Sequence, residues 1–222
     1  MAPKPITSKR SQQVRRYRSD LRKEQAEQTR QRIVAAAADL FTAEGYARTT
    51  LAKIAAAAGV SAETVAGHGP KAALMIAAME YVSFGVSGEE NILNVEMGRR
   101  FLEFDNRDAA MDYMVSTHTD MHERGAGLAQ ALISAAASDA ELDRYLGALF
   151  AGVTLQGRRL LTVTQDRGWL RDDVPFDELV ATCVVLSGVE TYLRMTGRDG
   201  WSVPRYRAWL RRTLTDALLK PT

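Results

Sequence analysis

Apolar residues recur at three- and four-residue spacing along almost the whole chain, and this spacing constrains the fold more than any other feature. It places apolar side chains on one face of an α-helix. No stretch shows the two-residue alternation that is typical of a half-buried β-strand. Gly45 and Gly59 interrupt the pattern where a helix would end. The sequence therefore predicts an all-α protein of about nine helices.

The expected helices differ in length along the chain. Short helices are expected up to about residue 80, and longer ones after it; Ser138 and Glu141 form a capping box that opens the helix from Asp139. The expected segments are a helix ending at Gly45, then 51–58, 62–66, a helix from Pro70, 107–123, 139–166, 177–195 and 202–219.

Charge divides the chain into two parts, although the formal net charge of the whole is only +2. Residues 1–80 carry thirteen Lys and Arg against seven Asp and Glu, and the remainder carries sixteen against twenty. Most of the excess lies in residues 1–25, a basic arm. Such arms bind polyanions or keep a tail solvated, and composition alone leaves both roles open.

Size and composition exclude several classes of protein. A chain of 222 residues, 46% of them hydrophobic, can bury a sizeable core without a metal or a disulfide. The longest run without charge, fourteen residues between Arg124 and Asp139, is too short to cross a bilayer, and no apolar block follows the basic N-terminus. We therefore expect a cytoplasmic protein with no membrane partner. The single cysteine, Cys183, is expected to be buried and inert.

The segment that follows the first core helix has the spacing of a helix-turn-helix. Counted from Leu51, such a motif needs a small residue at position five and a turn-tolerant residue at position nine, which are Ala55 and Gly59. Apolar residues stand at positions four, eight, ten and fifteen: Ile54, Ala58, Val60 and Val65. The second helix would present its polar face to a major groove about 12 Å wide. Taken alone, the spacing also fits an ordinary Ala-rich helix pair.

A longer pattern surrounds this motif and is continuous over some forty-five residues. It consists of Thr29, Arg30, Ala36, Ala37, Leu40, Phe41, Gly45, Tyr46, Thr49, Thr50, Ile54, Ala55, Ala58, Gly59, Val60, Ser61 and Lys71. In these positions, residues 28–74 resemble the DNA-binding domain of the tetracycline-repressor (TetR) family of bacterial transcriptional regulators. The resemblance implies an N-terminal three-helix DNA-binding domain at 26–80 and a C-terminal ligand-binding and dimerisation bundle at 81–222.

The resemblance also implies roles for individual residues. Bases would be read from the start of the 62–66 helix, where Glu63 either accepts from a cytosine amine or merely stabilises the helix N-terminus. Phosphates would be held by residues before and after it, and the arm from Lys9 to Lys23 would follow the backbone or enter the minor groove. The candidate DNA-binding residues are Arg48, Thr49, Thr50, Lys53, Ser61, Ala62, Glu63, Thr64, His68 and Lys71.

The end of the expected recognition helix departs from the family. Many relatives carry an aromatic pair where this chain has Ala66 and Gly69, and the chain is one residue shorter before Lys71. His68 stands at a position that is normally apolar or aromatic. We expect it to be half-packed on the core, with a phosphate contact as the main alternative.

The C-terminal region is expected to bind a small-molecule effector and to form a homodimer through helices 177–195 and 202–219. The ligand-binding residues are unknown, because the large apolar side chains would serve equally well in a bundle core; these are Phe101, Phe104, Met111, Tyr113, Met114, Phe150, Trp169, Tyr192 and Met195. His118 and His122 share a helix face, but zinc needs three or four ligands. We expect two surface histidines and no metal or cofactor.

Together these features favour a DNA-binding transcriptional regulator, a homodimeric repressor released from operator DNA by an effector. No Ser/His/Asp set, phosphate loop or carboxylate pair points to an enzyme. The alternative is a dimeric helical ligand- or partner-binding protein that has lost specific DNA recognition, and the departure at 66–69 keeps that alternative open.

Overall fold

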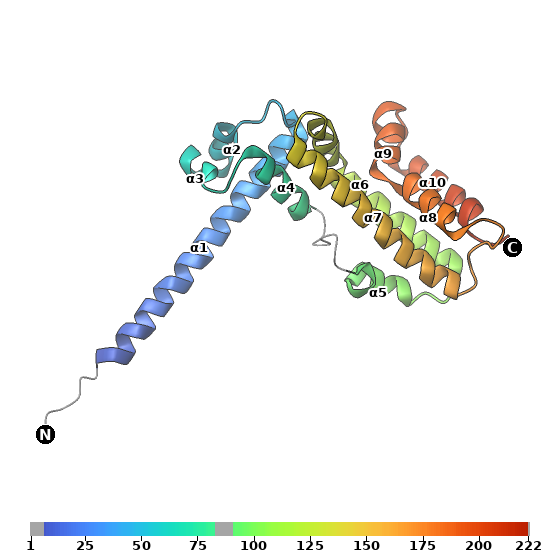
Figure 1. The fold of residues 1–222 in the computed structure, drawn as a ribbon, viewed down its shortest axis with the longest axis horizontal. Helices are drawn as coiled ribbons and strands as arrows, with labels where there is room; N and C mark the ends of the chain where they lie inside the picture. Colours follow the sequence, from blue (N-terminus) through green and yellow to red (C-terminus); the bar gives the residue numbers. More distant parts are fainter. Residues whose placement is uncertain (1–6, 83–90, 222) are drawn as a thin grey trace, which may run out of the picture.

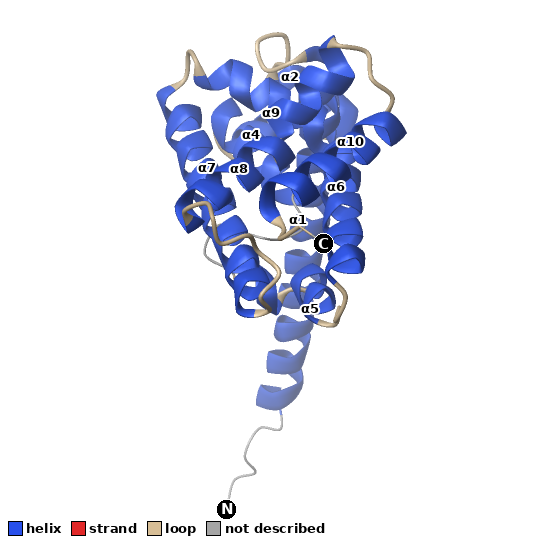
Figure 2. Cartoon of the chain, turned by 90° about the vertical axis from the view of Figure 1, so that its right-hand side faces the viewer, coloured by secondary structure: helices blue, strands red, loops and turns tan. Residues whose placement is uncertain are grey.

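The computed structural model describes residues 7–82 and 91–221, with side chains described from Leu21 onward except Arg22, and these residues are mostly helical. No strand occurs in these residues (Figure 2). The helices are α1 (Thr7–Glu44), α2 (Leu51–Ala58), α3 (Ala62–Ala66), α4 (Lys71–Val82), the 3-10 turn η1 (Ile92–Asn94), α5 (Glu96–Leu102), α6 (Arg107–Ala136), α7 (Ala140–Asp166), α8 (Phe176–Ser187), α9 (Val189–Tyr192), the π-helical η2 (Leu193–Arg198) and α10 (Val203–Leu218). The predicted all-α class is confirmed.

The C-terminal half of α1 is the platform of the N-terminal domain. Ile33 and Phe41 on this helix are fully buried, and α2, α4 and α6 all pack on it. Ile54 from α2 and Val65 from α3 complete the same apolar cluster. Figure 1 shows these short helices grouped around the end of α1, while its N-terminal half projects away from them. The first helix is therefore much longer than expected, and the basic arm continues it from Thr7.

The C-terminal domain is a bundle in which α6, α7, α8 and α10 each pack against two of the others (Figure 1). The inner face of α10 is fully buried at Tyr206, Leu210 and Leu214. Helix α7 begins at the expected place, but its N-cap is Asp139, whose carboxylate accepts from the amides of Glu141 and Leu142. The predicted capping box is wrong because the Ser138 hydroxyl instead donates to the Ala135 carbonyl of α6.

The predicted helix 177–195 is interrupted. Gly188 adopts an extended conformation, with φ −68° and ψ 155°, and divides α8 from α9. A Cβ there would lie 2.9 Å from the Val184 carbonyl oxygen, so the break requires glycine. The break releases the Ser187 carbonyl from the helix, and His122 Nε2 on α6 donates to it at 2.7 Å.

The prediction that His118 and His122 lie on the surface is wrong. His122 is buried between α6 and the α8–α9 break and stacks near the Tyr192 ring. Burial lowers its pKa to about 4, and burial also lowers the pKa of His118, whose ring is hydrogen-bonded to the Met114 carbonyl. Both imidazoles are thus held neutral inside the bundle.

The remaining predictions concern the core and the membrane. Cys183 is buried, as predicted, and burial raises its pKa to about 11. No single helix within 7–82 and 91–221 is both long and apolar enough to cross a bilayer; Phe176–Ser187 and Val189–Arg198 meet that test only jointly, across a 41° bend.

The lowered pKa of His122 predicts a fold that is less stable in acid. As pH falls from 6.5 toward 4, the unfolded chain takes up a proton that the folded chain does not accept. The free energy of unfolding should be fully retained above pH 6.5 and fall through this window by about 3 kcal/mol for this group. Urea unfolding measured across the window checks this.

Two variants separate His122 from other titrating groups. His122→Gln should reduce the pH dependence of the free energy of unfolding, leaving the contribution of His118, which has the same direction. His68→Gln, which changes an exposed histidine, should leave it unchanged. An unaltered acid slope in His122→Gln would mean that His122 is not held neutral.

Candidate nucleic-acid interface

The α2–α3 pair has the local structure of a helix-turn-helix. Thr50 caps α2 by accepting from the Lys53 amide, and Gly59 ends it at φ 66°, a left-handed conformation that favours glycine. Ser61 then caps α3, accepting from the Thr64 amide at 3.1 Å. The caps and the turn that the sequence predicts are thus present.

The two sides of α3 face different surroundings. Val65 is fully buried and anchors the helix on the core. Ala62, Glu63 and Thr64 are exposed at the start of the helix, with the Thr64 hydroxyl 2.8 Å from that of Ser61. Helix α3 is therefore held on the core by its buried side and exposes its first turn to solvent.

Basic side chains lie beside this exposed turn. Lys53 on α2 is half exposed; its ammonium pairs with the Glu44 carboxylate at 2.5 Å and also donates to the Arg48 carbonyl. The Arg48 guanidinium is exposed and donates to the Glu44 carbonyl at 2.8 Å. Surface pairs of this kind exchange readily with a stronger anion such as a phosphate.

Lys71 is turned inward, contrary to the predicted phosphate contact. Its ammonium donates to the Tyr46 carbonyl at 2.9 Å and lies 4.1 Å from the centre of the Tyr46 ring. Both contacts tie the start of α4 to the α1–α2 turn. In this structure the ammonium is engaged within the chain, so a phosphate contact would require it to leave Tyr46.

Thr49 and His68 also differ from the predictions. Thr49 is fully buried, and its hydroxyl donates to the Gly45 carbonyl at 2.9 Å, so it cannot reach DNA. His68 is exposed at the α3–α4 turn and is not half-packed on the core. Gly67, which follows α3, and the short connection lift this side chain off the core and into solvent.

A contact that sequence reasoning missed joins the two domains. The Tyr46 hydroxyl donates to the Asp139 carboxylate at 3.1 Å, across 93 residues of sequence. Burial, followed by Asp139, raises the pKa of Tyr46 to about 12. The Leu142 amide, with help from Tyr46, lowers the pKa of Asp139. Asp139 thus caps α7 and also binds Tyr46 in the α1–α2 turn. The only sequence signal is the position of Asp139 between two expected helices, which is typical of an N-cap but does not indicate the contact with Tyr46.

Residues 33–77 match the family model described as bacterial regulatory proteins, tetR family. The chain therefore carries a TetR-type helix-turn-helix domain and is a protein of the DNA-binding, transcription-regulating type. No curated protein matches the chain.

Solved TetR-like structures share the fold across the length of the chain. The SmeT–triclosan complex is 22% identical with a TM-score of 0.66, covering 86% of this chain and 92% of SmeT. NalD, the secondary repressor of the MexAB-OprM multidrug efflux pump in Pseudomonas aeruginosa, is 17% identical with a TM-score of 0.64, covering 89% and 100%. A regulator from Saccharomonospora viridis in complex with choline is 17% identical with a TM-score of 0.67, covering 86% and 98%.

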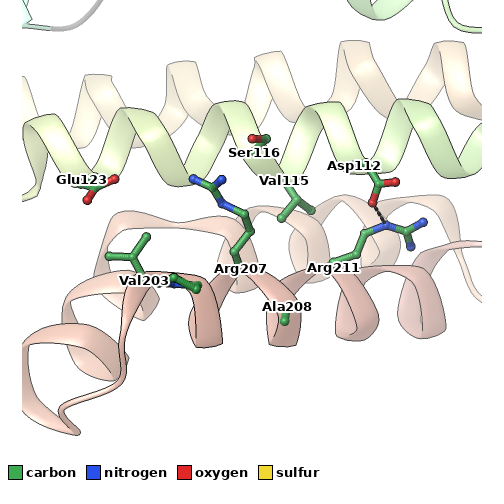
Figure 3. A pocket seen from close by; sticks show the side chains of 9 residues that line it. Asp112, Val115, Ser116, Glu123, Val203, Arg207, Ala208 and Arg211 are labelled. Atoms are coloured by element: carbon green, nitrogen blue, oxygen red, sulfur yellow. Dashed lines mark hydrogen bonds and ion pairs between the residues drawn. The ribbon is translucent and has the colours of Figure 1, made fainter.

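The described part of the bundle contains a small cavity and an outer groove. A cavity of about 10 Å³ lies among α5, α6 and α7, lined by Ile92, Met97, Gly98, Phe101, Tyr113, Met114, Thr117, His118 and Leu160. A groove of about 610 Å³ runs between α6 and α10 on the outside (Figure 3). Its arginines are already paired, Arg207 with Asp120 and Arg211 with Asp108 and Asp112.

Of the large apolar residues named from the sequence, Phe101, Tyr113 and Met114 line the small cavity. The others pack in the apolar clusters, except Phe150, which is exposed. No group of three or more metal-ligating side chains occurs in the part of the chain that the structure describes.

The inward position of Lys71 predicts that it stabilises the fold. Lys71→Ala should lower the free energy of unfolding by about 1–2 kcal/mol, because the Tyr46 carbonyl loses a charged donor and the ring loses its cation. Lys53→Ala, which removes a surface pair, should change it by less than about 0.5 kcal/mol. Urea unfolding of both variants checks this, and equal midpoints would contradict the assignment of Lys71.

Proposed function

We propose that this chain is a homodimeric transcriptional repressor that is released from its operator by a small-molecule effector. One observation carries the proposal: the first turn of α3 is exposed while Val65 fixes the helix on the core. Helix-turn-helix proteins contact base edges with the exposed N-terminal residues of a recognition helix that is packed on the domain core. A dimer would present two such helices to successive major grooves.

The contacts to DNA divide by chemistry. Thr64 and Glu63, beside Ala62, would meet base edges. Thr50, Ser61, Lys53, Arg48 and His68 are exposed around them and would meet phosphates, which position the protein without selecting sequence. Thr49 and Lys71 hold the scaffold and do not belong to this set.

The exposed apolar surface supports a dimer interface centred on α8. Val185 on α8 is 66% exposed, and Phe150 and Val153 on the neighbouring α7 are 38% and 44% exposed. Large exposed apolar side chains that gather in one region are typical of protein interfaces. The outward side of α10 instead presents Arg205, Arg212 and Asp216, so α10 would contribute less than expected from the resemblance.

The small cavity among α5, α6 and α7 supports an effector site. Its lining is almost entirely apolar, with His118 and Thr117 as polar groups, which is the composition of a ligand site. The groove in Figure 3 is a poorer candidate because paired charges line it. A ligand that moves α7 would act on Asp139, and through it on Tyr46 and the DNA-binding domain.

Specific DNA binding is the direct test. Duplexes enriched from a random library by the full chain should bind at least about 10³-fold more tightly than scrambled duplexes at physiological salt. Thr64→Ala should weaken only the enriched duplex, about tenfold or more. Lys53→Ala should weaken both and lower the salt slope by about one. Gel-shift titrations at several salt concentrations measure these effects.

Thr162→Ala, an exposed threonine on α7, is the matched control and should change nothing. Failure to enrich any sequence, with equal binding to all duplexes, would favour the alternative function, a helical ligand- or partner-binding protein without specific DNA recognition.

The dimer proposal predicts that a single carboxylate on α8 separates the protomers. Val185→Asp should give a monomer without unfolding the chain, because the side chain is already 66% exposed. Leu102→Asp, at a 39% exposed apolar residue on α5, is the matched control and should remain dimeric. Sedimentation equilibrium measures the mass; a dimeric Val185→Asp variant would place the interface elsewhere.

A further inference from the structure

The N-terminal half of α1 projects away from the rest of the fold (Figure 1). The helix begins at Thr7, and among the side chains described from Leu21 onward the first buried one is Ile33. The described side chains between Leu21 and Arg32 are exposed or half-buried, and their printed contacts are with each other, such as Gln31 with Glu27. At 1.5 Å per residue, residues 7–32 form a rod of about 39 Å.

This rod is strongly basic. Residues 7–32 contain nine Lys and Arg against three Asp and Glu, although the whole chain has a net charge of only +2. The basic positions are Lys9, Arg10, Arg15, Arg16, Arg18, Arg22, Lys23, Arg30 and Arg32. A long projecting helix whose like charges repel one another is marginal in water, so an anion that neutralises these charges would stabilise it.

The sequence of the rod identifies the anion as a polymer. At 100° per residue the basic positions fall around most of the helix circumference, and only Val14, Tyr17 and Leu21 make a short apolar stripe. That stripe is too short for a coiled coil or for the apolar face that membrane binding needs. Duplex DNA, with a charge about every 1.7 Å, matches a rod of cations without an apolar face.

The direction of the rod fits the same partner. Figure 1 shows the free part of α1 running away from the bundle, on the side of the molecule where α3 lies. Because α1 is one helix from Thr7 to Glu44, the buried end at Ile33 and Phe41 fixes the direction in which the rod leaves the domain. DNA that contacts α3 would be within reach of a rod longer than one helical turn of duplex, about 34 Å.

We propose that the N-terminal half of α1 is a second DNA-contacting element, a helical rod that binds phosphates flanking the half-site without reading sequence. This inference rests on the proposed DNA binding through α3. In this proposal the rod increases the affinity for DNA and lengthens the stretch of DNA that the protein covers. Sequence selection remains with α3. The basic arm is thereby distinguished from a tail that serves only solubility.

A charge-matched pair of variants tests the contact. The rod variant carries Gln in place of Arg15, Arg16, Arg18 and Arg22. The control carries Gln in place of Arg100, Arg144, Arg198 and Arg212, which are exposed in the C-terminal domain, and so has the same net charge. The probe is a duplex of arbitrary sequence of about 50 bp, long enough to lie along the rod.

For each bound protomer, the rod variant should reduce the magnitude of the slope of log K against log salt by about three to four. Its binding should be weaker by about tenfold or more, whereas the control should bind like the natural chain. On an enriched duplex, the ratio of specific to non-specific binding should not change. Equal slopes for the rod variant and the natural chain would overturn the inference, as would a change in oligomeric state with unchanged DNA binding.

Gln25→Pro tests the rod as a helix, because it breaks α1 at an exposed position and keeps every charge. Hydroxyl-radical footprinting on an enriched duplex should show loss of the outer protection while protection at the α3 grooves remains. Unchanged outer protection would show that a continuous helix is not needed. If no sequence can be enriched, the proposed repressor fails, but the arbitrary duplex still decides whether the rod binds DNA.

Discussion

The burial of one face of α1 is the interaction on which the structure depends. Ile33, Ala37 and Phe41 are fully buried on this face, and α2, α4 and α6 all pack against it. Fully burying an Ile or Phe side chain stabilises a fold by about 1.5–3 kcal/mol, and an Ala side chain contributes less. The same face therefore positions the helix-turn-helix, joins it to the bundle and sets the direction of the N-terminal rod.

The two domains are joined by polar contacts as well as by apolar packing. The Tyr46 carbonyl accepts a hydrogen bond from the Lys71 ammonium, and the Tyr46 hydroxyl donates one to the Asp139 carboxylate. Close packing adds to this link, since a Cβ on Gly127 of α6 would lie 2.7 Å from the Thr42 side chain of α1. These contacts link the α1–α2 turn to Asp139 at the start of α7, and α1 to α6.

The local structure of the N-terminal domain could be predicted because short-range rules decide it. Caps at Thr50 and Ser61 and the left-handed turn at Gly59 depend on residues within four positions. The inward position of Lys71, the buried His122 and the cap at Asp139 depend on groups far away in sequence or on a competing neighbour. Periodicity shows that a face is apolar but cannot show that a lysine on it finds a carbonyl 25 residues away.

The small volume of the cavity among α5, α6 and α7 has a consequence for selectivity. A guest molecule among α5, α6 and α7 has about 10 Å³ available and must displace side chains to be admitted. Met97 and Met114 line this space, and unbranched thioethers change shape at low cost, whereas the Phe101 and Tyr113 rings are rigid. Guests of quite different outline could then be accommodated with similar affinity, and discrimination among them would be broad.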